Sequence, residues 1–233
     1  MLRRSPHLFG AAAILAALGP APAPDAYTSQ RQRMVREQIE SRGIHRADIL
    51  HVLRTTPRHL FVPEGIRERA YDDCALPIGS GSTISQPYIV ALMTDLLTPQ
   101  KHQRILEIGT GSGYQAAVLA QLTEHVYTIE IMPDLAESSR EKLAGLGYSN
   151  VTVRQGNGYR GWPEEAPFDG IIVTAAPAEV PRTLIDQLAR GGRLVAPVGA
   201  GWAQNLTVIE KRVDGALVTY SVAPVLFVPM KSK

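Results

Sequence analysis

Two carboxylates and three glycines, spaced around the ends of two apolar runs, are the residues of this sequence best suited to chemistry. Glu107 lies two residues before a turn that contains Gly109, Gly111 and Gly113, and Glu130 ends the next apolar run. A glycine turn after a buried strand lets the backbone approach a nucleotide-like ligand, and an acid at the end of the next strand accepts hydrogen bonds from ribose hydroxyls. The pattern therefore predicts a site for an adenosine cofactor.

The details of the turn favour one cofactor over another. The dinucleotide fingerprint needs a glycine at position 114, where this chain has Tyr114, and its third glycine comes one residue early, at Gly113. A carboxylate at Glu107 would repel a pyrophosphate and attract a cationic amino group. The pattern thus favours S-adenosyl-L-methionine, which carries an ammonium and a sulfonium and no phosphate. A nicotinamide cofactor stays open as an alternative, as does a glycine turn that only packs a helix onto a sheet.

The composition indicates one soluble domain without metal or nucleic-acid chemistry. The 233 residues are 45% hydrophobic and 20% charged, with a net charge of +2, which is enough for a sizeable core and too little length for a second full domain. The sequence contains no run of basic residues and no stripe of mixed aromatic and basic residues, so we expect no binding of nucleic acid. The only cysteine, Cys74, cannot form an internal disulfide, and no His/Cys cluster has the spacing of metal ligands, so no metal is expected.

The first 26 residues differ from the rest. Arg3 and Arg4 precede an apolar run over residues 8–18 and a segment rich in Ala and Pro over 19–26, which is the order of a secretory signal. The apolar run is too short to span a bilayer as an ordinary helix, and a disordered or uncleaved extension is the alternative. Export conflicts with the supply of S-adenosylmethionine in the cytoplasm. We expect a cytoplasmic protein, with the periplasm as the alternative.

Residues 27–98 are predicted to form an N-terminal helical cap. Apolar residues at helical spacing predict helices over 28–42, ended by Gly43, and over 46–54. Prolines and glycines then break the chain into turns until about Pro87, and a helix is expected over 88–97. This stretch reads as a loop-rich part of the cap, since its apolar residues need to be buried.

Residues 99–233 are predicted to form the cofactor-binding sheet. Five apolar strands alternate with helices, which indicates a parallel sheet, and Asp214-Gly215 joins two further strands as an antiparallel hairpin. We therefore expect an α/β fold, doubly wound around a mostly parallel seven-stranded sheet that ends in a C-terminal antiparallel hairpin, in one domain over 27–233. This plan matches that of S-adenosylmethionine-dependent methyltransferases, a Rossmann-like fold. The predicted strands are 104–108, 126–130, 151–155, 169–174, 192–197, 205–212 and 217–228, and the predicted helices are 113–122, 133–145 and 181–189.

Several blocks of the sequence resemble one family, the protein-L-isoaspartate (D-aspartate) O-methyltransferases, especially their bacterial branch. The similarity runs from about Met34 to Val228, and the TISQP block at 83–87 is more specific to this family than the glycine turn. The blocks are residues 57–63 (PRHLFVP), 76–87 (LPIGSGSTISQP), 106–114 (LEIGTGSGY), 167–177 (PFDGIIVTAAP) and 191–199 (GGRLVAPVG).

The resemblance implies methyl transfer from S-adenosyl-L-methionine to the free α-carboxylate of L-isoaspartyl and D-aspartyl residues in damaged proteins and peptides. The ester then collapses to a succinimide, which begins repair. A carboxylate has a pKa of about 4, so it is already ionised near neutrality and needs no general base. We expect isoaspartyl-containing proteins and peptides as partners, no nucleic acid, no stable membrane association and a monomer. Methylation of another carboxylate or a small molecule, or a non-catalytic cofactor-binding module, remains open.

The resemblance also assigns roles to individual residues. Ser85 matches the family's catalytic serine, whose hydroxyl would orient the acceptor carboxylate, although a serine before Pro87 would also serve as a helix N-cap. The expected cofactor-binding residues are Pro87, Tyr88, Glu107, Ile108, Gly109, Gly111, Glu130, Asn157 and Gly158. Asn157 departs from the family's usual Asp, but its amide oxygen can accept a hydrogen bond from the adenine amino group. Cofactor binding should therefore be retained, at equal or lower affinity.

Overall fold

The N-terminal cap begins with a helical segment that ends at a left-handed glycine. The computed structural model describes residues 25–232, in which α1 (Thr28–Met34) continues through a π-helical turn (Val35–Ile39) and a 3-10 turn (Glu40–Arg42). Gly43 follows with φ +93°, a conformation that glycine adopts without steric cost, so it stops the helix as predicted. α2 (Ala47–Thr55) follows and buries Ile49, Leu50, Val52 and Leu53.

The turn-rich part of the cap contains a small hairpin that the sequence pattern did not predict. Two 3-10 turns (Arg58–Phe61 and Glu64–Arg69) lead into β1 (Leu76–Gly79), which pairs antiparallel with β2 (Ser82–Ile84). Both strands are too short to show a clear alternation of apolar and polar residues, so the glycines of their turn were the only visible signal. The hairpin leads into α3 (Pro87–Leu97), whose first residue is a proline, as is common in helices.

The second part of the chain forms the expected seven-stranded sheet, in the order β5-β4-β3-β6-β7-β8-β9. The strands β5, β4, β3, β6 and β7 are parallel, whereas β8 pairs antiparallel with β7 and β9 pairs antiparallel with β8. The fold class and the C-terminal hairpin are therefore confirmed. The strands are β3 (Arg104–Ile108), β4 (His125–Glu130), β5 (Val151–Gln155), β6 (Phe168–Val173), β7 (Leu188–Ala200), β8 (Ala203–Lys211) and β9 (Leu217–Val225).

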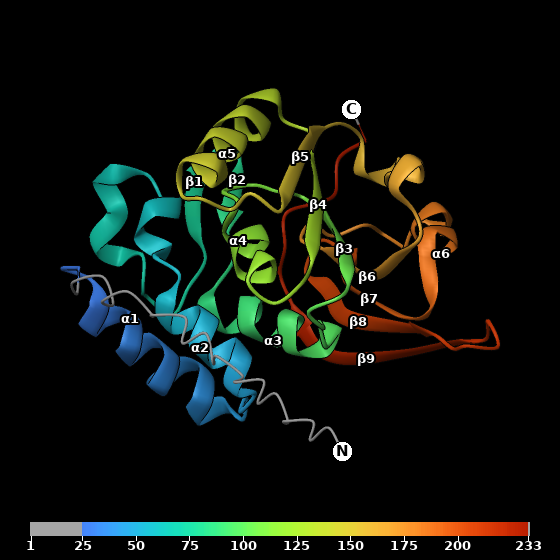
Figure 1. Cartoon of the computed structure of the whole chain (residues 1–233), viewed down its shortest axis with the longest axis horizontal. Coiled ribbons are helices and arrows are strands. Elements are labelled where there is room, and N and C mark those ends of the chain that lie inside the picture. Colours follow the sequence, from blue (N-terminus) through green and yellow to red (C-terminus); the bar gives the residue numbers. More distant parts are fainter. Residues whose placement is uncertain (1–24, 233) are drawn as a thin grey trace, which may run out of the picture.

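Helices cover both faces of this sheet, and the cap lies against one side of it (Figure 1). The helices that connect the strands are α4 (Tyr114–Ala120), α5 (Pro133–Gly145) and α6 (Arg182–Gln187). Neighbouring residues of a strand point to opposite faces. Accordingly, Ile105 of β3 joins the core cluster that contains residues of the cap, α3 and α4, while Leu106 joins the cluster that contains Leu184 of α6. The first cluster includes residues of both cap and sheet.

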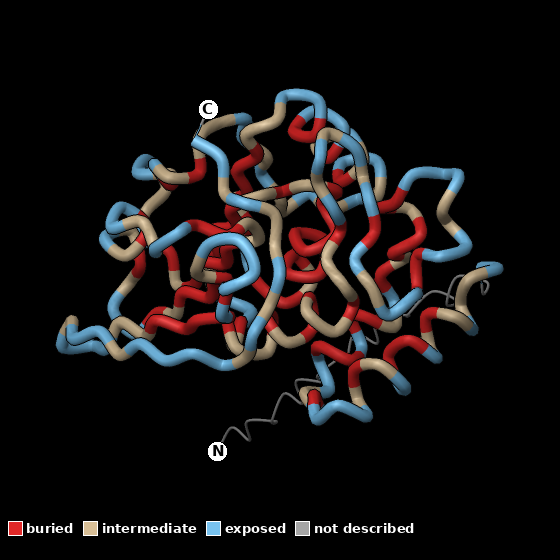
Figure 2. The backbone as a smooth tube through the Cα atoms, turned by 180° about the vertical axis from the view of Figure 1, so that it is seen from behind, coloured by how far each residue is buried: buried red, intermediate tan, exposed pale blue. Residues whose placement is uncertain are grey.

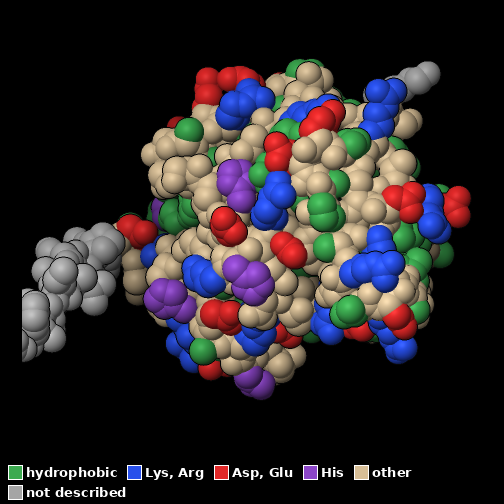
Figure 3. All heavy atoms as spheres, turned by 45° about the vertical axis from the view of Figure 1, so that its right-hand side comes forward, with side chains coloured by type: hydrophobic (Ala, Val, Ile, Leu, Met, Phe, Trp, Pro, Cys, Tyr) green, Lys and Arg blue, Asp and Glu red, His purple; other side chains and the backbone are tan. Residues whose placement is uncertain are grey.

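Burial falls off toward the outer loops and the tip of the β8–β9 hairpin, which are exposed (Figure 2). Figure 3 shows a face of the molecule on which acidic and basic side chains are interspersed.

The leader predicted over residues 1–26 lies outside the described residues except for Asp25 and Ala26. Asp25 already contacts the cap, since its carboxylate pairs with Arg31 at 3.2 Å. Between residues 25 and 232, no helix has the length and apolar character needed to cross a bilayer.

Candidate active site

The topology brings the predicted carboxylates to one point of the sheet. The chain runs from β3 to β4 and β5 in one direction and then returns to β6 and β7 on the other side of β3. In open α/β sheets, ligands bind at the carboxyl ends of the strands where the strand order reverses in this way. Glu107 lies near that end of β3 and Glu130 at that end of β4, with Thr174 directly after β6.

A cavity of about 860 Å³ opens at this point, and we call it the glycine-turn cavity. Segments from the β1–β2 hairpin, the ends of β3, β4 and β6, the turn after β5 and the C-terminal stretch surround it. Its lining residues are 81–85, 107–112, 114, 115, 129–132, 158, 174, 175 and 228–231.

Close approach explains why two positions around this cavity are glycine. Gly109 has φ +98°, and a Cβ there would lie 2.5 Å from Oγ1 of Thr174. A Cβ on Gly158 would lie 2.3 Å from Cγ2 of Ile108. Real Cβ atoms do not approach other atoms so closely, so both positions require the absence of a side chain.

Glu107 is the most unusual residue of the cavity. It is fully buried, and its Oε2 accepts a hydrogen bond from the hydroxyl of Thr128, its register neighbour on β4, at 2.5 Å. That hydroxyl in turn lies 2.7 Å from Oγ1 of Thr110. Within residues 25–232, Oε1 of Glu107 has no hydrogen-bond partner. Burial raises the pKa of Glu107 to about 8, opposed by the Thr128 hydrogen bond and assisted by the nearby charge of Glu130.

Glu130 is held by backbone donors of the turns around it. Its Oε2 accepts a hydrogen bond from the N–H of Gly111 at 2.8 Å, and its Oε1 accepts one from the N–H of Met132 at 3.0 Å. Each oxygen keeps a second lone pair for a ligand hydroxyl. The carboxylate is therefore fixed in place and still able to accept further hydrogen bonds.

Ser85 lies at the boundary between this cavity and a second one. The second cavity, which we call the Ser85 groove, is lined by residues 75, 83, 85, 86, 89, 174 and 224–228, and none of them is charged. The two cavities share Thr83, Ser85, Thr174 and Val228. The N-cap position of α3 is occupied by Gln86, not by Ser85. Among the described residues, the Ser85 hydroxyl makes no hydrogen bond with the protein, so it is not engaged as a helix cap.

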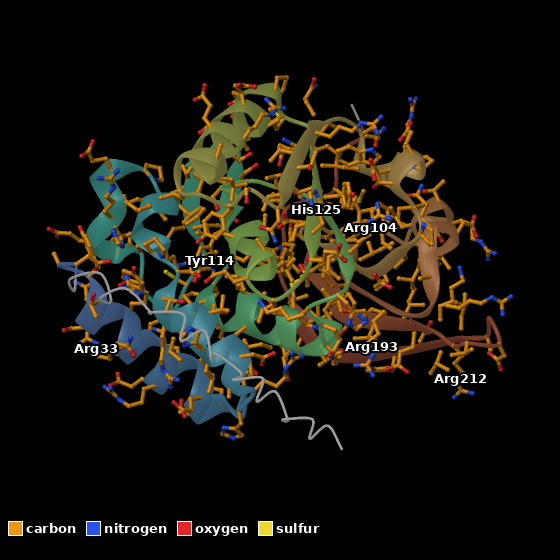
Figure 4. All side chains as sticks on the ribbon, viewed as in Figure 1. Arg33, Arg104, Tyr114, His125, Arg193 and Arg212 are labelled. Carbon is orange, nitrogen blue, oxygen red and sulfur yellow. The ribbon has the colours of Figure 1, made fainter. Side chains whose placement is uncertain are left out.

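A buried arginine holds the backbone of Ser85. Arg58 is fully buried; its Nη2 donates to the carbonyl of Ser85 at 2.7 Å and its Nε donates to the carbonyl of Ala70 at 2.7 Å. Its guanidinium lies 4.8 Å from the ring centroid of Tyr114, a residue at the start of α4 that Figure 4 labels. No carboxylate of the described chain pairs with Arg58, and burial lowers the pKa of this guanidinium.

The structure gathers most of the predicted site residues around the glycine-turn cavity, but not all of them. Those that line it are Ser85, Glu107, Ile108, Gly109, Gly111, Glu130 and Gly158. Pro87 is buried at the start of α3. Beside it, the ring centroid of Tyr88 lies 5.1 Å from Cζ of the Arg42 guanidinium. Asn157 precedes Gly158 with its side chain bound to backbone groups. These three residues do not line the cavity.

Three lining segments were missed by sequence reasoning. They are residues 81–84 of the β1–β2 hairpin, Thr174 and Ala175 after β6, and residues 228–231. The end of β6 carried a usable signal, because a residue that follows a parallel strand lies at the same sheet edge as the glycine turn. The C-terminal segment carried none, since nothing local indicates where a chain returns after its last strand.

The donor set of the cavity fits S-adenosylmethionine. A buried carboxylate oxygen without a partner suits an ammonium group, and a second carboxylate nearby would repel a pyrophosphate. Lys231 is the one cation among the described residues that line the cavity, and its side chain is exposed. In residues 25–232, no group of three His, Cys, Asp or Glu side chains is arranged to hold a metal ion.

Comparisons with known proteins agree on one family. The sequence profile described as protein-L-isoaspartate(D-aspartate) O-methyltransferase matches residues 29–233. The chain is 53% identical to a protein-L-isoaspartate O-methyltransferase of Synechococcus sp. over 91% of this chain and 89% of the relative, and 51% identical to one of Methanoculleus marisnigri over 88% and 93%.

Solved structures show the same likeness. A protein-L-isoaspartate O-methyltransferase superposes with a TM-score of 0.75 at 29% identity, over 85% of this chain and 65% of that one. A structure from Plasmodium falciparum, described as a beta-aspartate methyltransferase in complex with S-adenosyl-L-homocysteine, also gives a TM-score of 0.75, at 26% identity over 87% and 99%.

Proposed function

The chain belongs to the protein-L-isoaspartate(D-aspartate) O-methyltransferase family, and we propose on this basis that it methylates the free α-carboxylate of isoaspartyl residues in damaged proteins and peptides. S-adenosyl-L-methionine is the co-substrate, and when bound it supplies a methyl group on a positively charged sulfur. The observation that carries the proposal is the position of Ser85, whose unengaged hydroxyl lies where the glycine-turn cavity meets the uncharged Ser85 groove.

The glycine-turn cavity would hold the methyl donor. Glu107 offers its unpartnered oxygen to the ammonium of the methionine portion, and Gly109 and Gly111 let the backbone approach it. Glu130 would accept hydrogen bonds from the ribose hydroxyls, because its two oxygens are already oriented by backbone N–H groups. These assignments follow the family pattern residue by residue, and the lining of the cavity supports them.

The Ser85 groove would hold the acceptor. An extended peptide fits its open, uncharged wall of Ile89 and residues 224–228, and its carboxylate would reach Ser85 at the boundary with the donor. The buried cation of Arg58 lies behind Ser85 without a carboxylate partner. Its positive potential would favour an anionic group at that boundary over a neutral one.

The chain's residues need only position and desolvate the reactants. The acceptor carboxylate is ionised near neutral pH, so no side chain has to remove a proton from it. The Ser85 hydroxyl can donate to one carboxylate oxygen and leave the other oriented toward the methyl group. Alignment of this kind can lower a barrier by roughly 7 to 11 kcal/mol.

Transfer of labelled methyl groups to paired peptides tests the proposal. The two peptides have the same sequence and differ only in carrying aspartate or L-isoaspartate at one position. We expect base-labile label on the isoaspartyl peptide alone, since the ester of an α-carboxylate hydrolyses readily. Label on the aspartyl peptide or on a small molecule instead, or binding of S-adenosyl-L-homocysteine without any transfer, would contradict the proposed substrate.

A further inference from the structure

The last described residues of the chain form a wall of the glycine-turn cavity, and we call residues 228–232 the C-terminal strap. After β9 the chain crosses the carboxyl edge of the sheet and ends beside β5 (Figure 1). Backbone hydrogen bonds fix its first half, since the N–H of Ala176 donates to the carbonyl of Val228 and the N–H of Met230 donates to the carbonyl of Ala176, both at 2.8 Å. Residues 228–231 line the cavity.

The second half of the C-terminal strap is held by side chains of the turn that follows β5. The Tyr159 hydroxyl donates to the carbonyl of Met230 at 3.3 Å, and Nδ2 of Asn157 donates to the carbonyl of Ser232 at 2.8 Å. Between them lies Gly158, where an added Cβ would come within 3.2 Å of Cε of Met230. The turn and the strap therefore close the same end of the cavity together.

The two polar atoms of the Asn157 amide make hydrogen bonds to different parts of the chain. Its Oδ1 accepts a hydrogen bond from the N–H of Tyr159 at 2.9 Å and so caps the turn, whereas its Nδ2 binds the strap. An aspartate could accept the first hydrogen bond but could not donate the second, and its negative charge would face the carbonyl oxygen of Ser232. The departure from the family's usual Asp thus keeps the cap and adds a tether.

We propose that Asn157 is a positioning residue that fastens the C-terminal strap over the glycine-turn cavity, and not a direct ligand of the adenine. This rests on the proposed function only in assuming that the cavity binds the adenosyl cofactor. The side chain of Asn157 does not line the cavity, and both of its polar ends are engaged by the backbone. The strap then contributes its own backbone and Met230 to the wall that encloses the bound nucleoside.

The substitution Asn157→Asp separates the two roles by the sign of its effect. Under the strap assignment, the affinity for S-adenosyl-L-homocysteine falls roughly three- to tenfold, the range expected when one neutral hydrogen bond is lost. If Asn157 were an adenine ligand, restoring a carboxylate would strengthen the hydrogen bond from the adenine amino group, and affinity would stay equal or rise. Calorimetry on the full chain decides between these outcomes, and an unchanged or higher affinity overturns the proposal.

Limited proteolysis with trypsin tests the attachment of the C-terminal strap in the absence of cofactor. Lys231 is exposed, so trypsin can cut after it once the strap leaves the surface. We expect Asn157→Asp and Tyr159→Phe both to lose the residues after Lys231 several-fold faster than the wild type, as followed by mass spectrometry. Equal cutting rates in all three proteins would contradict a tether.

The matched control is Asn150→Asp. Nδ2 of Asn150 also donates to backbone carbonyls, those of Ala120 at 2.8 Å and Glu124 at 3.1 Å, but it makes no hydrogen bond with the described residues of the C-terminal strap. This variant should leave both the affinity and the cutting rate within twofold of the wild type. A wild-type protein that fails to bind S-adenosyl-L-homocysteine would instead refute the cofactor assignment of the proposed function.

Discussion

The glycine-turn cavity and the Ser85 groove share four lining residues, yet they differ in the charges around them. The cavity has two carboxylates, Glu107 and Glu130, at the ends of adjacent strands. None of the described residues that line the groove is charged. The buried cation of Arg58 lies behind Ser85, and no carboxylate of the described residues pairs with it. A cationic methyl donor on one side and an anionic acceptor on the other match this division.

The two sides also differ in how they are built. The cavity is made mainly from strand ends and a glycine turn, whose positions follow from the order of the parallel strands. The groove is made from the cap, from Thr174 after β6, and from the end of β9 with the residues that follow it, and these parts meet only in the folded chain. Changes to the cavity should therefore alter cofactor affinity, whereas changes to the groove should alter turnover at unchanged cofactor affinity.

Replacing Ser85 by alanine should have the largest effect on turnover. The Ser85 hydroxyl is expected to orient the acceptor carboxylate, and a misplaced reactant can cost about 10²-fold in rate. We expect kcat/KM for an isoaspartyl peptide to fall by about 10²-fold while the dissociation constant of S-adenosyl-L-homocysteine stays within twofold. Steady-state methylation and calorimetry give the two numbers.

The exposed serine Ser41 supplies a matched control, because its hydroxyl donates to the carbonyl of Glu37 and it lines neither cavity. Ser41→Ala should change neither quantity. Wild-type turnover in Ser85→Ala would contradict the role of Ser85 in orienting the acceptor. An equal loss of cofactor affinity would contradict the expectation that changes to the groove leave cofactor binding unchanged.

The sequence predicted the cavity better than the groove for physical reasons. Strand periodicity fixes the alternation of Ile105 and Leu106 between the two cores, and the strand order then brings Glu107 and Glu130 to one edge. For the hairpin β1–β2 the sequence predicts only turns, because strands of four and three residues are too short to show an alternating pattern. Contacts such as that of Arg58 with the carbonyl of Ser85 join residues 27 positions apart through a backbone group, and no local pattern encodes them.

Replacing Glu107 by glutamine should have the largest effect on cofactor affinity. The variant keeps the size of the side chain and removes the charge that would pair with the ammonium. Hydrogen bonds to charged groups contribute roughly 1.5 to 3 kcal/mol, so we expect the dissociation constant of S-adenosyl-L-homocysteine to rise by about 10- to 100-fold. The kcat at saturating co-substrate should change much less. A large loss of kcat with normal affinity would place Glu107 in the chemistry and contradict the division.

The pH dependence of cofactor binding tests the same carboxylate without a mutation. Burial raises the pKa of Glu107 to about 8 in the protein without ligand. Pairing with an ammonium needs the ionised form, so affinity should rise with pH by up to about tenfold per unit below that pKa. Calorimetry at pH 7 in buffers of different ionisation enthalpy should show proton release on binding, and Glu107→Gln should abolish it.

The same shift predicts the sign of a stability change. The folded chain keeps a proton on Glu107 that the unfolded chain has released above its ordinary pKa of 4.5. The free energy of unfolding of the ligand-free protein should therefore decrease as pH rises from about 4.5 to about 8, in part through this residue. In Glu107→Gln that part of the decrease should vanish, as measured by urea unfolding across the range.

The smallest effect on turnover is expected for Arg58→Lys, which keeps a positive charge behind Ser85 but removes the planar guanidinium group. One ammonium cannot reproduce the geometry that binds the carbonyls of Ala70 and Ser85 together, so one carbonyl loses its partner at a cost of about 1 to 3 kcal/mol in stability. We expect kcat/KM to fall only about threefold to tenfold, since the charge is retained, with cofactor affinity unchanged. The exposed Arg36, paired with Glu37, supplies the control substitution Arg36→Lys, which should change nothing measurable. If Arg58→Lys weakened cofactor binding as strongly as turnover, the arginine would support both sides, and the two sides would act as one unit.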